Sequence, residues 1–134
     1  MTHKILVVED DVETLKFFGL LLRAAGFEVQ LASVPAEGLR LARLAPPSLV
    51  LLDVMMPDMD GWEVCERLRQ IAQMPIIFVT ALKDAQNLSK GLVLADDYIV
   101  KPFDPRDLIQ RVRAQIGRSA EGSPADRPGG AGHQ

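Results

Sequence analysis

The sequence contains one cysteine, no long apolar run and little excess of either charge. The lone thiol of Cys65 excludes a disulfide within the chain and any zinc site built from several cysteines. Lysine and arginine total 15 against 18 acidic residues, a net charge of -3. Because nucleic-acid-binding surfaces carry a basic excess, we predict no direct nucleic-acid contact by this domain. The apolar runs are too short to cross a membrane. No signal-peptide pattern precedes the first apolar segment, so we predict a cytoplasmic protein without membrane contact.

The last residues lack every large apolar side chain. Residues 119–134 read SAEGSPADRPGGAGHQ and contain no valine, isoleucine, leucine, methionine or aromatic residue. Such a stretch cannot bury a core, so we predict a flexible tail or linker over 119–134. The folded domain is then expected over residues 1–118, a length that needs no disulfide or structural metal.

Short apolar segments alternate with segments of helical periodicity along the rest of the chain. Strands are expected at 4–8, 27–31, 48–52, 75–80 and 97–100, and helices at 12–25, 36–44, 62–72, 84–94 and 105–116. This alternation predicts an α/β fold in which right-handed crossovers build a parallel five-stranded sheet. Helices are expected on both faces of that sheet, so the fold is a doubly wound (βα)5 arrangement.

Polar side chains follow the expected strands where each strand ends. Glu9 and Asp10 follow the first strand, Asp53 follows the third, Thr80 ends the fourth, and Lys101 follows the fifth. Ligands of open α/β sheets bind beyond the carboxyl ends of the strands. We therefore expect these side chains to converge at one edge of the sheet.

Carboxylates gathered at one edge repel one another unless a cation neutralises them. Mg²⁺ prefers oxygen ligands and commonly accompanies phosphate chemistry. A lysine and a hydroxyl beside such a cluster suit a phosphoryl group held on a carboxylate nucleophile. The alternative is that the acidic residues are helix caps and solvated loop ends. We favour the alternative for Asp11, which precedes a helical segment, but not for Asp53, which directly follows four apolar strand residues.

Five ordered motifs resemble those of the receiver domain of bacterial two-component response regulators, such as the chemotaxis regulator and the OmpR/PhoB-type receivers. The motifs are Ile5–Asp11, Leu51–Pro57 with Met59–Gly61, Val79–Ala81, Asp96–Tyr98 and Lys101–Phe103. The resemblance implies a flavodoxin-like sheet with strand order 2-1-3-4-5. It also implies a phosphorylatable signalling switch that controls a partner or an output domain.

The resemblance implies a role for each site residue. Asp53 is the expected phosphoacceptor, supplied by a sensor histidine kinase. Mg²⁺ is expected on Asp10, Asp53 and the backbone carbonyl of Met55, with Glu9 helping through water.

Three further roles come from the same resemblance. Lys101, in a cis bond to Pro102, is expected to pair with Asp53 and the phosphoryl oxygens. Thr80 is expected to hydrogen-bond the phosphoryl group, and Tyr98 to turn inward behind it. Such a domain has two conformations, and the charge of the added phosphoryl group shifts the equilibrium between them.

The signal is expected to leave through the predicted helix at 84–94, the fifth strand and the last helix, a surface that also forms homodimers in relatives. Its candidate residues are Leu88, Lys90, Val93, Asp97, Asp107 and Arg111. Asp97 and Arg111 are expected to form an ion pair between subunits. In relatives, a basic residue at the position of Leu88 usually pairs with Asp107. Leucine cannot form this pair, and Lys90 is the basic residue left nearby.

The segment before Ala95 departs from the family pattern. Relatives usually place a glycine before Ala-Asp-Asp-Tyr, whereas residues 91–94 here run directly into Ala95, one residue short. Leu88 and Val93 also stand at positions that are often charged. Two interpretations stay open: the shortened helix packs differently, or it presents a more hydrophobic face to a partner.

Two alternatives to the signalling switch are a phosphohydrolase and a receiver that is never phosphorylated. A phosphohydrolase of the haloacid-dehalogenase type needs a second aspartate where Met55 stands, and a receiver that is never phosphorylated would not need this complete set of site residues. We therefore predict no enzymatic activity beyond Mg²⁺-dependent self-phosphorylation. Slow self-dephosphorylation is also expected, because neither Met55 nor Leu82 can orient a water.

Residues 119–134 are either a free end or, as we favour, a linker to a DNA-binding output domain that is absent from this chain.

Overall fold

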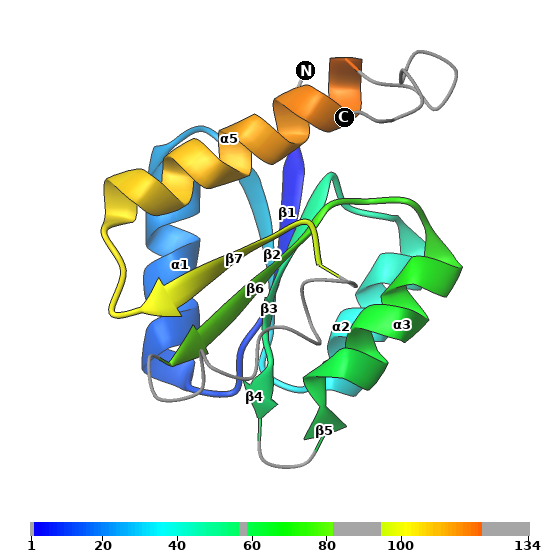
Figure 1. Ribbon diagram of the computed structural model, residues 1–134. Coiled ribbons are helices and arrows are strands. Elements are labelled where there is room, and N and C mark those ends of the chain that lie inside the picture. The colour runs from blue at the N-terminus through cyan, green and yellow to red at the C-terminus, as the bar shows by residue number, and fades with distance from the viewer. Residues whose placement is uncertain (1, 57–58, 82–94, 122–134) are drawn as a thin grey trace.

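The computed structural model describes residues 2–56, 59–81 and 95–121. Five parallel strands form one sheet in the order β2-β1-β3-β6-β7 (Figure 1). Their bounds are Lys4–Val8 for β1, Glu28–Ala32 for β2, Leu49–Asp53 for β3, Ile76–Ala81 for β6 and Asp97–Lys101 for β7. Counted along the chain, this order is 2-1-3-4-5, which confirms the predicted fold class.

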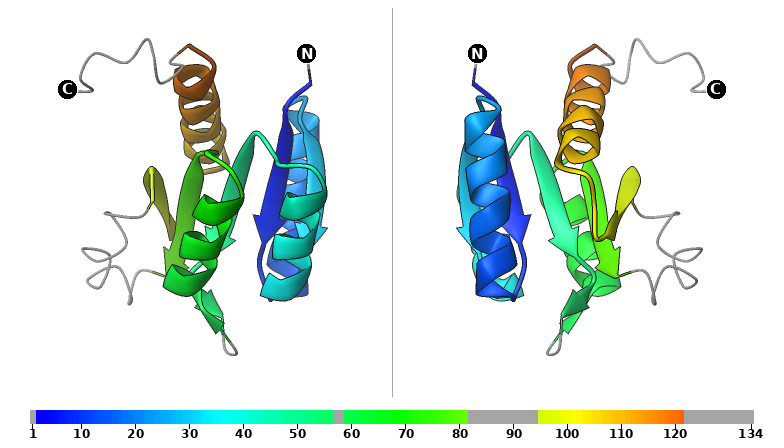
Figure 2. Two further views of the ribbon diagram at one scale, coloured as in Figure 1. Left: turned by 90° about the vertical axis from the view of Figure 1, so that its right-hand side faces the viewer. Right: turned by 90° about the vertical axis from the view of Figure 1, so that its left-hand side faces the viewer.

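Four described helices cover the two faces of the sheet. Their bounds are Val12–Ala24 for α1, Pro35–Leu44 for α2, Gly61–Ile71 for α3 and Pro105–Glu121 for α5. Helices α2 and α3 lie in front of the sheet in one view, and α1 and α5 in the opposite view (Figure 2). Helix α5 continues beyond its predicted end at Ile116. The helix predicted over 84–94 lies outside the described residues, as does Leu82.

The core consists of two layers separated by the sheet. Leu6, Leu52 and Phe78 belong to the layer under α2 and α3. Their neighbours Val7 and Leu51 belong to the layer under α1 and α5, together with other alternate strand residues. Successive strand side chains point to opposite faces, and both faces are covered, so a central strand must be apolar throughout. This explains why the central strands β1, β3 and β6 read mostly as apolar runs.

Local signals in the sequence set both ends of α1. Asp11 is the N-cap, and its side chain accepts a hydrogen bond from the Thr14 backbone amide at 3.1 Å. Gly26 follows the helix with a φ of 98°, a conformation that glycine adopts without a steric penalty. The structure confirms the capping role preferred for Asp11.

A small hairpin between β3 and α3 was not predicted. Strands β4 (Met55–Met56) and β5 (Met59–Asp60) pair antiparallel just beyond the end of β3 (Figure 1). Asp60 then caps α3 by accepting from the Trp62 amide at 2.9 Å. At Gly61, an added Cβ would lie 2.5 Å from the Cα of Val54. The backbone beyond Asp53 is therefore packed directly against the start of α3.

Asp96 ties the chain entering β7 to the rest of the domain. Its carboxylate accepts from the Ile76 amide at 2.8 Å and from the Arg69 guanidinium at 2.7 Å. Arg69 also donates to the backbone carbonyl of Met74 at 2.6 Å. These contacts fix the start of β7 beside β6, so the strand that ends in Lys101 begins from a defined position.

No helix in the described ranges combines the length and hydropathy needed to span a bilayer.

Candidate functional site

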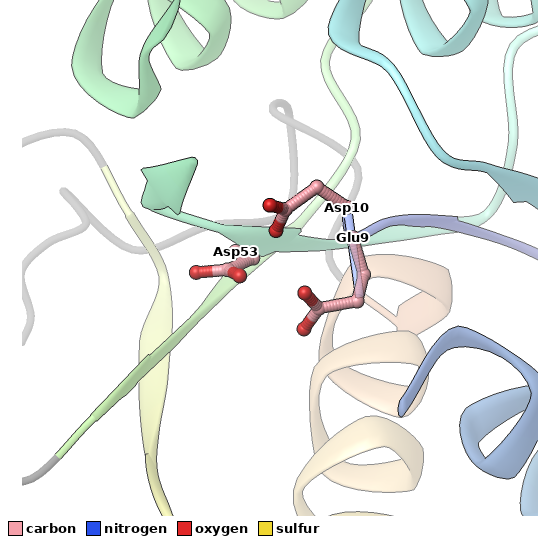
Figure 3. Close-up of side chains that lie close together, drawn as sticks. All are labelled: Glu9, Asp10 and Asp53. Atoms are coloured by element: carbon pink, nitrogen blue, oxygen red, sulfur yellow. The ribbon is translucent and has the colours of Figure 1, made fainter. Parts of the chain in front are cut away.

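Three carboxylates meet at the carboxyl edge of the sheet. Glu9 and Asp10 directly follow β1, and Asp53 is the last residue of β3 (Figure 3). Strands β1 and β3 are neighbours, with Val8 paired to Leu52, so the residues that come next arrive side by side. Carboxylate oxygens from all three lie within 4.8 Å of one another. The convergence predicted from the strand ends is therefore present for these residues.

The three carboxylates differ in their exposure to water. Glu9 is 1% exposed and Asp53 is 5% exposed, whereas Asp10 is exposed. A buried carboxylate is costly unless a cation or hydrogen-bond donors compensate it. The Asp11 backbone amide supplies one donor, at 3.1 Å from Glu9 Oε2.

Lys101 supplies the compensating positive charge. It is the last residue of β7, and its Nζ lies 2.8 Å from Glu9 Oε1 and 3.7 Å from Asp53 Oδ2. The resemblance led us to expect the pair with Asp53, but the shorter contact is with Glu9. Glu9 and Asp53 are both almost completely buried, so both carboxyl groups benefit from the Lys101 charge. The Lys101–Pro102 peptide bond is cis, as expected.

Burial also controls protonation at this edge. Burial and the nearby Asp53 side chain raise the pKa of Glu9 to about 7, although its hydrogen bond to Lys101 opposes the rise. Burial alone would lower the pKa of Lys101, but the Glu9 hydrogen bond and the Asp53 and Glu9 charges outweigh it. The pKa of Lys101 is consequently raised, so the lysine stays an ammonium ion. Among the described residues, the Lys101 ammonium lies beside Glu9 and Asp53 in a cluster of three carboxyl groups, an environment that attracts a further cation.

Thr80 and Tyr98 lie on the adjoining strands β6 and β7. Thr80 is fully buried, and its hydroxyl donates to the Ala81 carbonyl at 3.4 Å. Asp53 is paired with Val79, so Thr80 stands one residue beyond the level of Asp53. Tyr98 is half-buried against the layer under α2 and α3. Thr80 therefore lies at the same edge of the sheet as the carboxylates, and Tyr98 lies on β7, the strand next to that of Thr80.

The donor set fits a hard divalent cation. Three carboxylates offer oxygen atoms, the ligands that Mg²⁺ prefers, and one of them is exposed to solvent. Met55, whose backbone carbonyl is the fourth expected ligand, lies in β4 two residues after Asp53. The acidic cluster can thus hold a metal ion at the carboxyl edge.

The expected dimer residues are only partly described. Arg111 donates to Asp97 at 2.8 Å and to Asp107 at 3.0 Å, both within the same chain. Asp107 lies four residues before Arg111 on α5, and Asp97 is the first residue of β7. The Asp97–Arg111 pair expected between subunits is therefore formed within one subunit here, and Asp107 has Arg111 as a basic partner. Leu88, Lys90 and Val93 lie outside the described ranges.

Sequence reasoning missed two features of the site. The first is the direct contact of Glu9 with Lys101, for which only the burial of Glu9 is a signal, and burial is a tertiary property. The second is Gly61, whose missing side chain lets Val54 approach α3. An Asp-Gly pair just before a helical segment was the available signal for Gly61, because such a pair often marks a turn where the backbone comes close.

Comparison with known proteins agrees with this geometry. Residues 5–113 match the family model of the response regulator receiver domain. The chain is 44% identical over 117 residues to a probable transcriptional regulator, ycf27, of Cyanophora paradoxa, covering 87% of this chain and 49% of that protein. It is 40% identical over 127 residues to the DNA-binding response regulator MtrA of Mycolicibacterium smegmatis, covering 94% of this chain and 55% of that protein. The chain thus spans about half the length of these relatives.

Solved structures show the same likeness over whole domains. A putative response regulator from Chloroflexus aurantiacus superposes with a TM-score of 0.82 at 34% identity, covering 88% of this chain and 100% of that one. A response regulator receiver domain protein from Clostridium thermocellum gives 0.83 at 29% identity, with coverage of 89% and 98%. A 2-1-3-4-5 sheet with acidic residues at its carboxyl edge and a family match over most of its length show that this chain belongs to the response regulator receiver domain family of two-component signalling.

Proposed function

We propose that the domain is a switch that accepts a phosphoryl group on Asp53 from the phosphohistidine of a sensor histidine kinase in the cytoplasm. The observation that carries this proposal is the position of the Asp53 carboxylate. It ends a buried strand beside Glu9 and Asp10, with the Lys101 ammonium 3.7 Å away. A nucleophilic carboxylate, a candidate cation site and a fixed positive charge are the parts that phosphoryl transfer needs.

The transfer is a displacement at phosphorus. An Asp53 carboxylate oxygen forms the new P–O bond while the bond between phosphorus and the histidine nitrogen breaks. The electron pair of that bond leaves with the imidazole, which takes up a proton. Negative charge spreads over the phosphoryl oxygens during this step, so Lys101 contributes most if its ammonium contacts them. Glu9, Asp10, Asp53 and the Met55 carbonyl would hold Mg²⁺, which supplies further positive charge when bound.

Phosphorylation would be transmitted through Thr80 and Tyr98. The hydrogen bond of Thr80 to the Ala81 carbonyl is 3.4 Å long and therefore weak, so a phosphoryl oxygen competes easily for that hydroxyl. A shift of Thr80 opens space behind it for Tyr98 on the neighbouring strand. Residue Tyr98 is linked through its backbone carbonyl to Arg111 of α5 at 3.3 Å, so its movement alters the β7–α5 surface.

Intact-mass measurement tests the proposal. We expect the protein to gain the mass of one phosphoryl group when incubated with Mg²⁺ and acetyl phosphate, and Asp53→Asn to abolish the gain. Asp60→Asn is the matched control, because Asp60 is an exposed helix cap and asparagine also caps helices. No gain in the original protein, or a gain that persists in Asp53→Asn, would refute the assignment.

After the acetyl phosphate is removed, we expect the original protein to lose its phosphoryl group more slowly than the Met55→Asn variant does.

The output is proposed to be a DNA-binding domain. The relative MtrA is named as a DNA-binding response regulator, and this chain spans about half of it. We propose a receiver at 1–118 and a linker at 119–134, of which the first residues, 119–121, continue α5. The receiver itself is proposed to make no contact with nucleic acid or membrane. The reading frame beyond Gln134 would show whether such a domain follows.

Phosphorylation is further proposed to favour a homodimer through β7, α5 and the segment at 84–94. Arg111 holds Asp97 and Asp107 within one chain, and a pair between subunits would exchange one of these partners. Light scattering with beryllofluoride, a phosphoryl mimic, is expected to show a doubled mass that Arg111→Ala diminishes. An unchanged monomer would contradict the dimer.

A further inference from the structure

Three phenylalanine rings form a cluster beside the site. Phe18 and Phe103 are stacked with their centroids 5.2 Å apart and their planes 7° apart, and Phe17 tilts against Phe103 at 6.1 Å. Phe18 is completely buried, Phe103 is half-buried, and Phe17 is 44% exposed. None of these rings takes part in the proposed chemistry.

The cluster joins two segments that carry opposite charges of the site. Phe103 stands two residues after Lys101, in the connection between β7 and α5. Phe17 and Phe18 belong to α1, which begins three residues after Glu9. The two segments also meet in the 2.8 Å contact between Lys101 and Glu9. The ring contacts and the ionic contact therefore hold the same pair of segments together.

The backbone that follows Lys101 leaves the sheet. Strand β7 lies at the edge of the sheet, and its pairing with β6 ends at the Ala81–Lys101 pair. Beyond that pair, no strand in the described part of the chain holds the segment before α5. The contacts of the Phe103 ring thus hold the backbone two residues after Lys101 against α1.

We infer that Phe103 is a positioning residue, which holds the Lys101 ammonium where phosphoryl transfer to Asp53 requires it. The inference rests on the proposed function. A lysine has a long stem with several rotatable bonds, so the placement of its ammonium depends on how firmly its backbone is held. A small displacement of a charge from its productive position can cost about a hundredfold in rate.

Mutation of Phe103 to leucine tests the inference in the full chain. With saturating Mg²⁺ and acetyl phosphate, we expect Phe103→Leu to lower the maximal rate of phosphorylation by about tenfold or more, as displacement of a charged group would. Phe103→Trp keeps a stacking ring and is expected to retain most of the rate. Phe27→Leu is the matched control, since Phe27 is half-buried in the same core layer but precedes β2, at the opposite edge of the sheet.

Testing Phe103→Leu both in the original protein and in a Lys101→Ala protein separates an effect on the position of Lys101 from a general effect on packing. If Phe103 acts through Lys101, Phe103→Leu should lower the rate little further in a Lys101→Ala protein, because interacting residues are non-additive. An equal loss in both backgrounds, or a loss no greater than that of Phe27→Leu, would overturn the inference. Failure of the original protein to be phosphorylated on Asp53 would instead overturn the proposed function.

Discussion

Lys101→Ala is expected to lower the maximal rate of Asp53 phosphorylation by about a hundredfold, the usual cost of removing one fixed donor to a developing negative charge. The Lys101 ammonium lies 2.8 Å from Glu9 and 3.7 Å from Asp53, so its loss leaves three carboxyl groups without that charge. The hydrogen bond that opposes the rise in the pKa of Glu9 is lost as well. That pKa therefore rises further, and a proton on Glu9 at neutral pH competes with the cation for its carboxylate.

The rate is measured by intact mass against time at increasing acetyl phosphate and saturating Mg²⁺. Lys4→Ala is the matched control. Lys4 begins β1, at the opposite end of the strand from Glu9, and its ammonium donates to the Ala45 carbonyl at 3.0 Å. This control removes a lysine with a hydrogen bond but leaves the site untouched. Equal rates for Lys101→Ala and Lys4→Ala would show that Lys101 does not stabilise the transferred group.

Gly61→Ala is expected to lower the free energy of unfolding by about 3 kcal/mol, the upper part of the usual range for overpacking. The new Cβ would lie 2.5 Å from the Cα of Val54 and 2.9 Å from its carbonyl oxygen. Both are backbone atoms, so relief requires movement of the chain rather than rotation of a side chain. Val54 directly follows Asp53, so the same movement should slow phosphorylation.

Urea denaturation measures this loss, and Gly117→Ala is the matched control. Gly117 lies inside α5, and an added Cβ there would meet no atom within 4 Å. The same substitution at this position should raise the free energy of unfolding by about 0.5–1 kcal/mol, because alanine favours a helix over glycine. If Gly61→Ala is as stable as the original protein, Val54 and α3 do not require the close approach.

Most of the fold was predictable because its signals are local. The central strands β1, β3 and β6 read mostly as apolar runs, since layers of helices cover both faces, whereas the edge strands β2 and β7 contain polar residues. Asp11 and Gly26 marked the ends of α1 through their capping chemistry. The hairpin formed by β4 and β5 was not predictable in this way, because strands of two residues show no periodicity. Helix α5 passes its predicted end at Ile116 because its last residues, Gly117 to Glu121, continue a helix without an apolar stripe.

The sequence by itself determined the order of strands and helices, the residues at each strand end and the family, because these depend on neighbours in the chain. Only the tertiary structure decided which charges pair. Lys101 and Glu9 are 92 residues apart, and their 2.8 Å contact exists because β1 and β7 end at the same edge of one sheet. The burial of Glu9 and Asp53, which makes both carboxyl groups depend on that lysine, comes from enclosure by distant segments and has no counterpart in local sequence.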